Sequence, residues 1–237
     1  MRDASLAEIR ELALFRDIGE ATFEALTRSA YHQTFPPQVT LIHQGQSADF
    51  FHVVTDGLVE LVGNWNGREN TMVVLRPVST FTLAACMTDA PYLMAARTIE
   101  QSRVILIPSS DLRAAFAADT AFALAIAHEL ANCCRGMVRH AKDMKLRTSR
   151  ERLAGYILRQ SALRGGASRF ELPLEKRLLA SFLGMTPENL SRALRALRDD
   201  GLAIDATHVT IADRAALDRV AHVTPLIDGP EPGAPDR

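Results

Sequence analysis

The stretch that decides the fold runs from Lys176 to Arg198 and reads KRLLASFLGMTPENLSRALRALR. Its apolar residues recur at steps of three and four on both sides of a Gly-Met break, which predicts two short amphipathic helices joined by a tight turn. Ala180 is small enough for the second helix to cross the first, and Gly184 lets the chain turn without a Cβ clash. This spacing is typical of a helix-turn-helix.

The second predicted helix has a well-marked start and a polar face. Thr186 can cap it, Pro187 suits its first position, and Glu188 lies in the positively polarised first turn. From that start, the face turned outward carries Glu188, Ser191, Arg192 and Arg195. A carboxylate can accept from cytosine N4, an arginine can bind guanine O6 and N7 with two bonds, and a serine hydroxyl is adaptable. The pattern favours a DNA-reading helix, but a solvated helical hairpin would show the same spacing.

The charge distribution favours a polyanionic partner for the same part of the chain. The net charge of the whole protein is −1, yet residues 145–198 hold twelve Lys or Arg against four acids, a local excess of eight positive charges. Lys176 and Arg177, at the start of the first predicted helix, belong to this basic region. Together with Thr186, they are candidate DNA-contacting residues beside the reading face.

Composition limits the class of protein. With 237 residues, 47% hydrophobic and 23% charged, the chain predicts a soluble globular protein of two modest domains. No apolar run approaches the roughly 20 residues that cross a bilayer, and the N-terminus is charged, so we expect a cytoplasmic protein without a membrane partner. Three cysteines without a spaced Cys/His set predict neither a zinc site nor an iron–sulfur cluster. No catalytic pattern is present, so we expect no enzyme.

The rest of the chain predicts an α+β fold of several segments. Short β-rich runs between residues 35 and 108, separated by turn signals such as Asp56-Gly57, predict an antiparallel β-roll preceded by N-terminal helices. The pattern becomes helical after Asp111, and a two-stranded wing is expected at 202–211. The predicted segments are a sensing domain (1–110), a dimerisation helix region (111–147), a winged helix-turn-helix domain (148–224) and a disordered tail (225–237).

A second helical pattern predicts self-association. Apolar or adaptable residues step by 4, 3, 4, 3 and 4 along one helix, at Ile126, Leu130, Cys133, Met137, His140 and Met144. This is the spacing of a coiled-coil seam, and Gly136 beside it permits close approach of a second helix. We therefore expect a parallel homodimer through this helix. The competing interpretation is a helix packed along the roll of its own subunit.

The order of these segments resembles the CRP/FNR family of bacterial transcription regulators. The resemblance covers residues from about 12 to 220 and is most specific in the segment LASFLGMTPENLSRALRALRDDGL. The Glu188-x-x-Ser191-Arg192 spacing is similar to the FNR-type recognition helix, which reads a TTGA-like half-site within an inverted repeat. The resemblance implies a homodimeric regulator that binds double-stranded DNA and contacts RNA polymerase.

The roll departs from the family's effector chemistry. Cyclic-nucleotide binders of this family carry a Gly-Glu segment and, about ten residues later, an Arg-Ser or Arg-Thr pair. The corresponding positions here are Phe81 to Met87 and Met94-Ala95, so neither charge is present. A cyclic phosphate without a cation would lose a charge-assisted hydrogen bond worth roughly 1.5–3 kcal/mol. We therefore expect no cyclic AMP binding. The cysteine run of FNR-type oxygen sensors is missing as well.

An apolar effector pocket is the remaining expectation for the roll. Leu83, Cys86, Met87 and Met94 would suit a hydrophobic ligand such as haem, as in the nitric-oxide-responsive, denitrification-type members that this chain resembles. No metal ligand can be assigned, because Cys86-Met87 is followed by Thr88 where the family's carbon-monoxide sensor has histidine. Cys86 is better explained as a buried small hydrophobe than as a haem ligand. Effector-independent or redox control, and a small-molecule-binding module whose helix-turn-helix contacts protein, remain alternatives.

Overall fold

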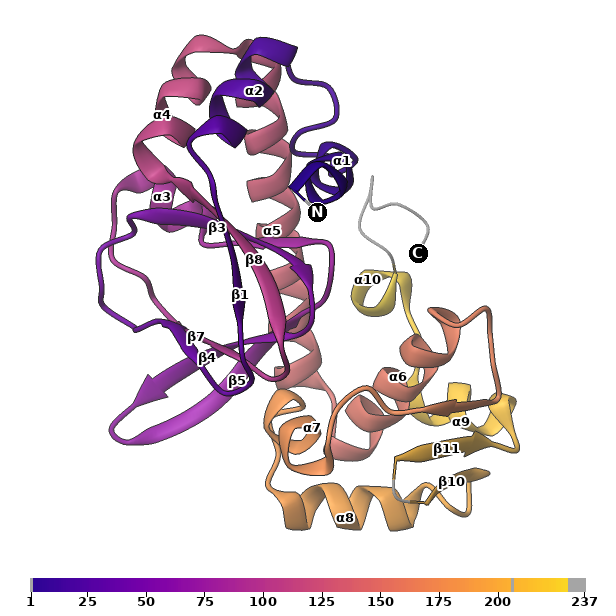
Figure 1. The fold of residues 1–237 in the computed structure, drawn as a ribbon. Helices are drawn as coiled ribbons and strands as arrows, with labels where there is room; N and C mark the ends of the chain where they lie inside the picture. Colours follow the sequence, from indigo (N-terminus) through magenta and orange to yellow (C-terminus); the bar gives the residue numbers. More distant parts are fainter. Residues whose placement is uncertain (1, 206, 230–237) are drawn as a thin grey trace. The chain divides into compact units, whose positions relative to one another are not determined.

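The computed structural model describes residues 2–205 and 207–229. The chain forms two compact units, Met1–Ala131 and Asn132–Arg237, whose boundary lies within the long helix α5 (Thr120–Leu146) (Figure 1). The first unit contains the roll and the second contains the helix-turn-helix. The finer division of the chain at residues 110 and 147 stays a prediction.

Eight strands of the first unit form two antiparallel four-stranded sheets. Their orders are β1-β8-β3-β6 and β2-β7-β4-β5, which confirms the predicted antiparallel roll. At the turn after β3, Gly57 has a φ of +81°, and an added Cβ would lie 2.3 Å from the carbonyl oxygen of Gln101. Only glycine fits this turn. The strands are β1 (Tyr31–Phe35), β2 (Thr40–Ile42), β3 (Phe50–Asp56), β4 (Val59–Trp65), β5 (Arg68–Leu75), β6 (Ser79–Phe81), β7 (Ala95–Thr98) and β8 (Ser102–Pro108).

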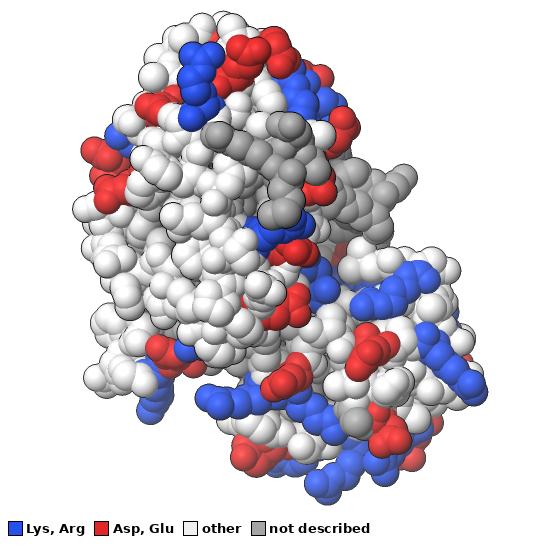
Figure 2. Space-filling view, in the orientation of Figure 1, with Lys and Arg blue, Asp and Glu red and all other residues white. Residues whose placement is uncertain are grey.

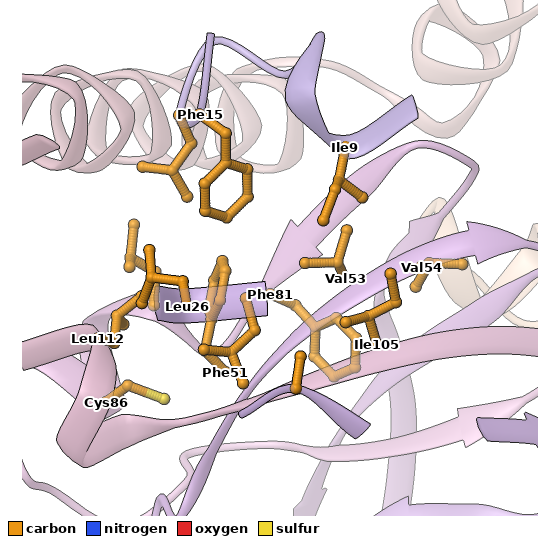
Figure 3. Close-up of a cluster of buried hydrophobic side chains, with 14 of the residues drawn as sticks. Ile9, Phe15, Leu26, Phe51, Val53, Val54, Phe81, Cys86, Ile105 and Leu112 are labelled. Carbon is orange, nitrogen blue, oxygen red and sulfur yellow. The ribbon is translucent and has the colours of Figure 1, made fainter. Parts of the chain in front are cut away.

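The helices of the first unit share one hydrophobic core with the roll (Figure 3). Phe15 stacks on Phe122 of α5 at a centroid distance of 6.2 Å and tilts against Phe51 of β3 at 6.5 Å. Burying each such side chain contributes roughly 1.5–3 kcal/mol. The core therefore joins the sheet to the helices α1 (Arg2–Arg10), α2 (Glu20–Arg28), α3 (Leu83–Thr88), α4 (Ser109–Ala118) and the first part of α5.

The structure corrects the predicted seam on α5 at both ends. Ile126 is 1% exposed and belongs to the core of its own unit, so it has no surface left for a partner. Leu130 packs partly against the same core. Met144 lies against Gly184 of its own chain. The exposed residues of the seam are Cys133, Met137 and His140, and Met137 is 67% exposed.

The second unit is a winged helix-turn-helix, as predicted. Thr148 and Glu151 form a capping box at the start of α6, and a three-stranded sheet of order β10-β11-β9 forms the wing. Residues 225–228 form a helix, which corrects the predicted disordered tail for that part, whereas residues 230–237 lie outside the described residues. The elements are α6 (Ser149–Ala162), β9 (Arg169–Glu171), α7 (Lys176–Phe182), α8 (Pro187–Ala196), β10 (Leu202–Asp205), β11 (His208–Ile211), α9 (Arg214–Ala221) and α10 (Pro225–Asp228).

Among the helices of residues 2–205 and 207–229, no single one is long and apolar enough to cross a bilayer. One pair, α4 and α5, passes the test only when taken together, and it is bent by 117°.

Candidate nucleic-acid interface

The turn between α7 and α8 has the geometry that the sequence predicts. Gly184 has a φ of +61°, a conformation that residues with a Cβ rarely adopt, and an added Cβ would lie 2.0 Å from the Met144 Cε. Ala180 is 1% exposed on α7, and Leu190 of α8 is equally buried. Small residues at the turn therefore let α8 cross α7 closely.

The first turn of α8 is fixed by its own side chains. The Thr186 hydroxyl accepts a hydrogen bond from the backbone N–H of Asn189 at 3.2 Å, and Pro187 occupies the first helical position. The pKa of Glu188 is lowered, first by a hydrogen bond from its own backbone N–H and then by the Thr186 hydroxyl and the charge of Arg192. Glu188 is therefore ionised at neutral pH and can act only as an acceptor.

The outward face of α8 carries the four residues that the sequence assigns to DNA. Glu188, Ser191, Arg192 and Arg195 are all exposed, whereas Leu190 and Ala193 face the core. The Ser191 hydroxyl donates to the carbonyl oxygen of Pro187 at 2.9 Å. The helix therefore presents an anionic, a hydroxyl and two cationic groups along one side.

Asn189 is a member of this face that the sequence analysis missed. Its side-chain oxygen accepts a hydrogen bond from the Nη2 of Arg192. The signal was available, because positions three apart on a helix are neighbours and both residues follow the cap. Asn189 thus orients the guanidinium that points away from the protein.

The start of α7 adds positive charge to the second unit. Lys176 and Arg177 are both exposed there. Figure 2 shows basic side chains gathered over the second unit, with acidic ones between them, whereas one broad face of the first unit is nearly free of charge. The basic groups of this unit can contact a polyanion from several elements.

The residues proposed to line an apolar pocket are core residues in the structure. Leu83 is 5% exposed and Cys86 is fully buried, and both belong to the continuous core. Met87 and Met94 pack against that core from its edge. Burial raises the pKa of the Cys86 thiol, and its sulfur donates to the Thr82 hydroxyl at 3.7 Å. Leu83 and Cys86 are therefore part of the packed core, and Met87 and Met94 cover its edge.

Haem does not fit this arrangement. A haem iron needs a thiolate, an imidazole or a comparable ligand that faces the cofactor. Cys86 is held as a buried thiol, and His52 stacks on Phe81 at a centroid distance of 4.7 Å. Burial lowers the pKa of His52 to about 4, with a smaller opposing effect of a hydrogen bond that the ring donates to the backbone carbonyl of Phe50. Among residues 2–205 and 207–229 no group of three or more His, Cys, Asp or Glu could hold a metal ion.

The arginine three positions after Met94 already has a carboxylate partner. Arg97 donates to Glu60 Oε1 from Nε at 2.8 Å and from Nη2 at 2.6 Å. Glu60 is nearly buried, and its other oxygen accepts from the Thr71 hydroxyl at 3.1 Å. The guanidinium of Arg97 is therefore already engaged by a nearly buried carboxylate.

Comparisons with known proteins agree with both units. Residues 32–119 match the cyclic nucleotide-binding domain family, and residues 151–220 match the Crp-like helix-turn-helix domain family. The chain is similar to the CRP-like cAMP-activated global transcriptional regulator of Mycobacterium tuberculosis, with 23% identity over 214 residues, 88% of this chain and 96% of that protein.

Two solved structures show the same fold over most of the chain. A candidate cAMP-binding regulatory protein of Silicibacter pomeroyi DSS-3 is 28% identical, with a TM-score of 0.61 over 93% of this chain and 100% of that one. FixK2 of Bradyrhizobium japonicum is 23% identical, with a TM-score of 0.71 over 82% of this chain and 98% of its own. With both domain families matched in this order, the chain belongs to the CRP/FNR family of transcription regulators.

Proposed function

We propose that the protein is a homodimeric transcription regulator that reads a TTGA-like inverted repeat with α8. The observation that carries this proposal is the capped N-terminus of α8, which presents Glu188, Ser191 and Arg192 on one exposed face. Regulators of this family bind DNA and act as dimers.

Each side chain of the face has a chemical role in this proposal. Arg192 binds guanine O6 and N7 with two hydrogen bonds, and Glu188 accepts from a cytosine amino group. Ser191 offers a hydroxyl that can exchange its bond to Pro187 for a base edge. Phosphate contacts come from the residues around the reading face, namely Thr186, Lys176, Arg177 and Arg195.

The dimer would form through the exposed part of the α5 seam. Cys133, Met137 and His140 retain the spacing of a coiled coil and lie on the surface of the described chain. A parallel pair of these helices would place two recognition helices about 34 Å apart, in successive major grooves of an inverted repeat. RNA polymerase is the expected further partner of the DNA-bound dimer.

Control by cyclic AMP is not part of the proposal. Near Met94 in the sequence, Arg97 is bound to Glu60 and so is already engaged by a carboxylate. Leu83 and Cys86, two of the residues predicted to line a haem pocket, are buried in the core, so control by haem or nitric oxide is not proposed either. The pairing of Arg97 with Glu60 favours DNA binding that requires no bound cyclic nucleotide.

A gel-shift assay tests the proposal directly. The full chain should bind a TTGA-N6-TCAA duplex more tightly than a scrambled duplex, without added cyclic AMP. Glu188→Ala should lose this preference while holding or raising its affinity for the scrambled duplex, because the loss of an acid increases attraction to phosphate. Equal weakening on both duplexes, with the fold intact by circular dichroism, would contradict the base-reading role. A wild-type protein that binds neither duplex would favour a helix-turn-helix that contacts protein.

A further inference from the structure

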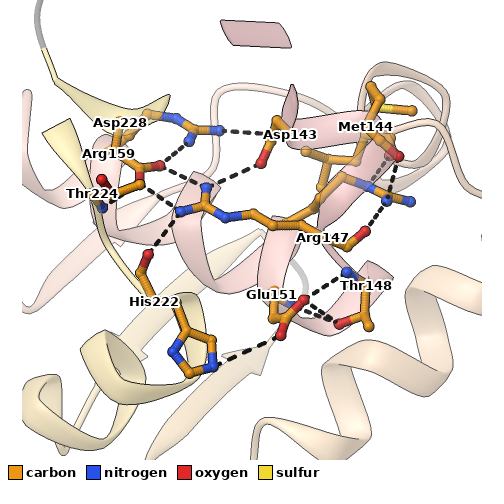
Figure 4. A network of polar contacts seen from close by, with 11 residues as sticks. Asp143, Met144, Arg147, Thr148, Glu151, Arg159, His222, Thr224 and Asp228 are labelled. Atoms are coloured by element: carbon orange, nitrogen blue, oxygen red, sulfur yellow. Dashed lines mark hydrogen bonds and ion pairs between the residues drawn. The ribbon is translucent and has the colours of Figure 1, made fainter. Parts of the chain in front are cut away.

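The last described residues of the chain are tied to the junction between α5 and α6 (Figure 4). Asp228, at the end of α10, has a side chain that is only 6% exposed. It accepts from Arg147 at both oxygens, Oδ1 from Nη1 at 2.8 Å and Oδ2 from Nη2 at 2.6 Å. Such a paired carboxylate–guanidinium contact has a narrow geometry. It therefore holds α10 in one position against the junction.

Further bonds complete the environment of this carboxylate. Asp228 also accepts from Arg159 Nη1 of α6 at 2.8 Å and from the backbone N–H of Thr224 at 3.0 Å. Burial raises its pKa, but the bonds from Arg147 and Thr224 and the two arginine charges outweigh this, so the pKa is lowered. The group is an ionised carboxylate at neutral pH.

Arg147 connects three segments of the second unit through one guanidinium. Besides Asp228, it donates to Asp143 of α5 at 3.0 Å and to the carbonyl oxygen of His222 at 3.2 Å. At Gly155 of α6, an added Cβ would lie 3.2 Å from Arg147 Nη1, so the guanidinium packs closely against the backbone of α6. About two turns before Arg147 on α5, Arg139 donates to the carbonyl oxygen of Gly229 at 2.8 Å. The C-terminal segment thus bridges α5 and α6 at two levels.

The junction is also connected to the helix-turn-helix. Arg152 of α6 donates to the carbonyl oxygen of Arg147 at 2.6 Å and, through Nε, to that of Leu183 at 3.0 Å. Leu183 ends α7, directly before the turn into the reading helix. A change in the angle between α5 and α6 would therefore strain buried bonds on both sides of the junction.

We propose that residues 222–229 are a clamp that fixes the distal half of α5 relative to the DNA-reading domain, with Asp228 as its positioning residue. The proposal rests on the dimeric DNA reader proposed above. In a dimer joined through α5, the angle at the junction sets the distance between the two recognition helices. The clamp thereby sets which spacing of half-sites the dimer accepts, while α8 alone sets which bases are read.

The experiment compares spacing preference with base preference. The full chain and Asp228→Asn are titrated with TTGA-Nx-TCAA duplexes of five, six, seven and eight spacer base pairs, and with a six-base-pair duplex carrying one altered guanine. Asp228→Asn should reduce the preference for the best spacer by about tenfold. A more mobile junction between α5 and α6 lowers the effective concentration of the second DNA-reading domain at its half-site. Its discrimination against the altered guanine should stay that of the wild type. Asp218→Asn on α9 is the matched control and should change neither.

Two outcomes overturn the proposal. One is an unchanged spacing preference in Asp228→Asn. The other is an equal loss of spacing and base preference, which would indicate a general structural role. If Asp228→Asn does not fold, Arg159→Gln decides, because it leaves the pair of Arg147 and Asp228 intact. It should lower the spacing preference less, but in the same direction, and an unchanged preference would overturn the proposal.

A measurement without DNA separates this inference from the proposed function. Backbone amides of residues 144–152 should exchange hydrogen for deuterium faster in Asp228→Asn than in the wild type, because the junction opens locally more often. Unchanged exchange would overturn the clamp even if the wild type reads DNA. Faster exchange in a protein that binds no DNA would support the clamp and contradict the dimeric reader.

Discussion

At the N-terminus of α8, hydrogen bonds within the helix determine how the reading side chains are presented. The Thr186 hydroxyl caps the helix by accepting from the backbone N–H of Asn189, and the side-chain oxygen of Asn189 accepts from the guanidinium of Arg192. A guanidinium that is already oriented loses less conformational freedom when it binds a base edge. If Arg192 reads a base as proposed, we expect Asn189 to contribute to affinity without touching the DNA.

Arg192 and Lys176 should differ in how their loss affects DNA binding. Arg192→Ala is expected to cost roughly 1–3 kcal/mol on the cognate duplex and to remove discrimination at one guanine. Lys176→Ala should weaken all sequences alike and reduce the salt slope of binding by about one. Titrations of cognate and single-substituted duplexes at several salt concentrations measure both effects. Uniform weakening by Arg192→Ala would show that this residue contacts only phosphate.

His52 should make the protein less stable in mild acid. Burial lowers its pKa from 6.5 to about 4. Between pH 6.5 and pH 4, the imidazole of His52 is therefore protonated in the unfolded chain but neutral in the folded protein. The contribution of the neutral ring is full above pH 6.5 and is lost as the pH falls toward 4, by up to about 3 kcal/mol. Urea unfolding at pH 7 and pH 4.5 measures this loss. It should be smaller in His52→Phe, whereas His43→Gln, at an exposed position, should behave like the wild type.

At the scale of elements, the turn between α7 and α8 depends on both backbone conformation and space. Gly184 and Gly165 have similar φ values of +61° and +66°, but only Gly184 lies against another side chain, that of Met144. The pair therefore allows the two contributions to be separated.

Gly184→Ala should destabilise the protein more than Gly165→Ala. The left-handed conformation alone costs a residue with a Cβ about 1–2 kcal/mol, and we expect this loss for Gly165→Ala. Gly184→Ala adds displacement of the Met144 methyl group from a Cβ position 2.0 Å away. Free energies of unfolding in urea measure both variants. The excess should disappear in a Met144→Ala background; equal losses in the two glycine variants would contradict the role of this contact.

For the whole molecule, the proposed dimer depends on the exposed part of α5. Met137→Glu should give monomers in sedimentation velocity, because a dimer would bury the new carboxylate without a partner. Ala131→Glu, an exposed position on the same helix but outside the predicted seam, is the control and should stay dimeric. A dimer that persists in Met137→Glu would show that association uses another surface.

Cyclic AMP should produce no heat in titration calorimetry of the full chain at millimolar concentration. A bound cyclic phosphate would lack a charge-assisted hydrogen bond worth roughly 1.5–3 kcal/mol, since Arg97 is bonded to Glu60. DNA affinity measured with and without the nucleotide should be equal. Tight binding would show that Arg97 can exchange its carboxylate partner for a phosphate.

The sequence by itself determined the order of the segments and the reading face of α8. Both depend on local chemistry, because the cap at Thr186, the glycine at 184 and the helical spacing of apolar residues act over a few positions. The antiparallel roll was predictable for the same reason, since alternation and turn residues mark its strands. The match of residues 151–220 to a helix-turn-helix family agrees with that local pattern.

Only the tertiary structure decided how partly apolar residues are used. The spacing of Ile126 fits a seam and the apolar character of Cys86 suits a pocket, but both residues belong to the core of the first unit. Periodicity shows which face is apolar, and it does not show which other element covers that face. The predicted disorder of residues 225–228 was wrong for a related reason. Pro and Gly residues suggest disorder there, whereas Asp228 is held in place by Arg147, about 80 positions earlier in the chain. Whether such segments are ordered or buried depends on contacts between residues far apart in the sequence, and local sequence patterns do not predict these contacts.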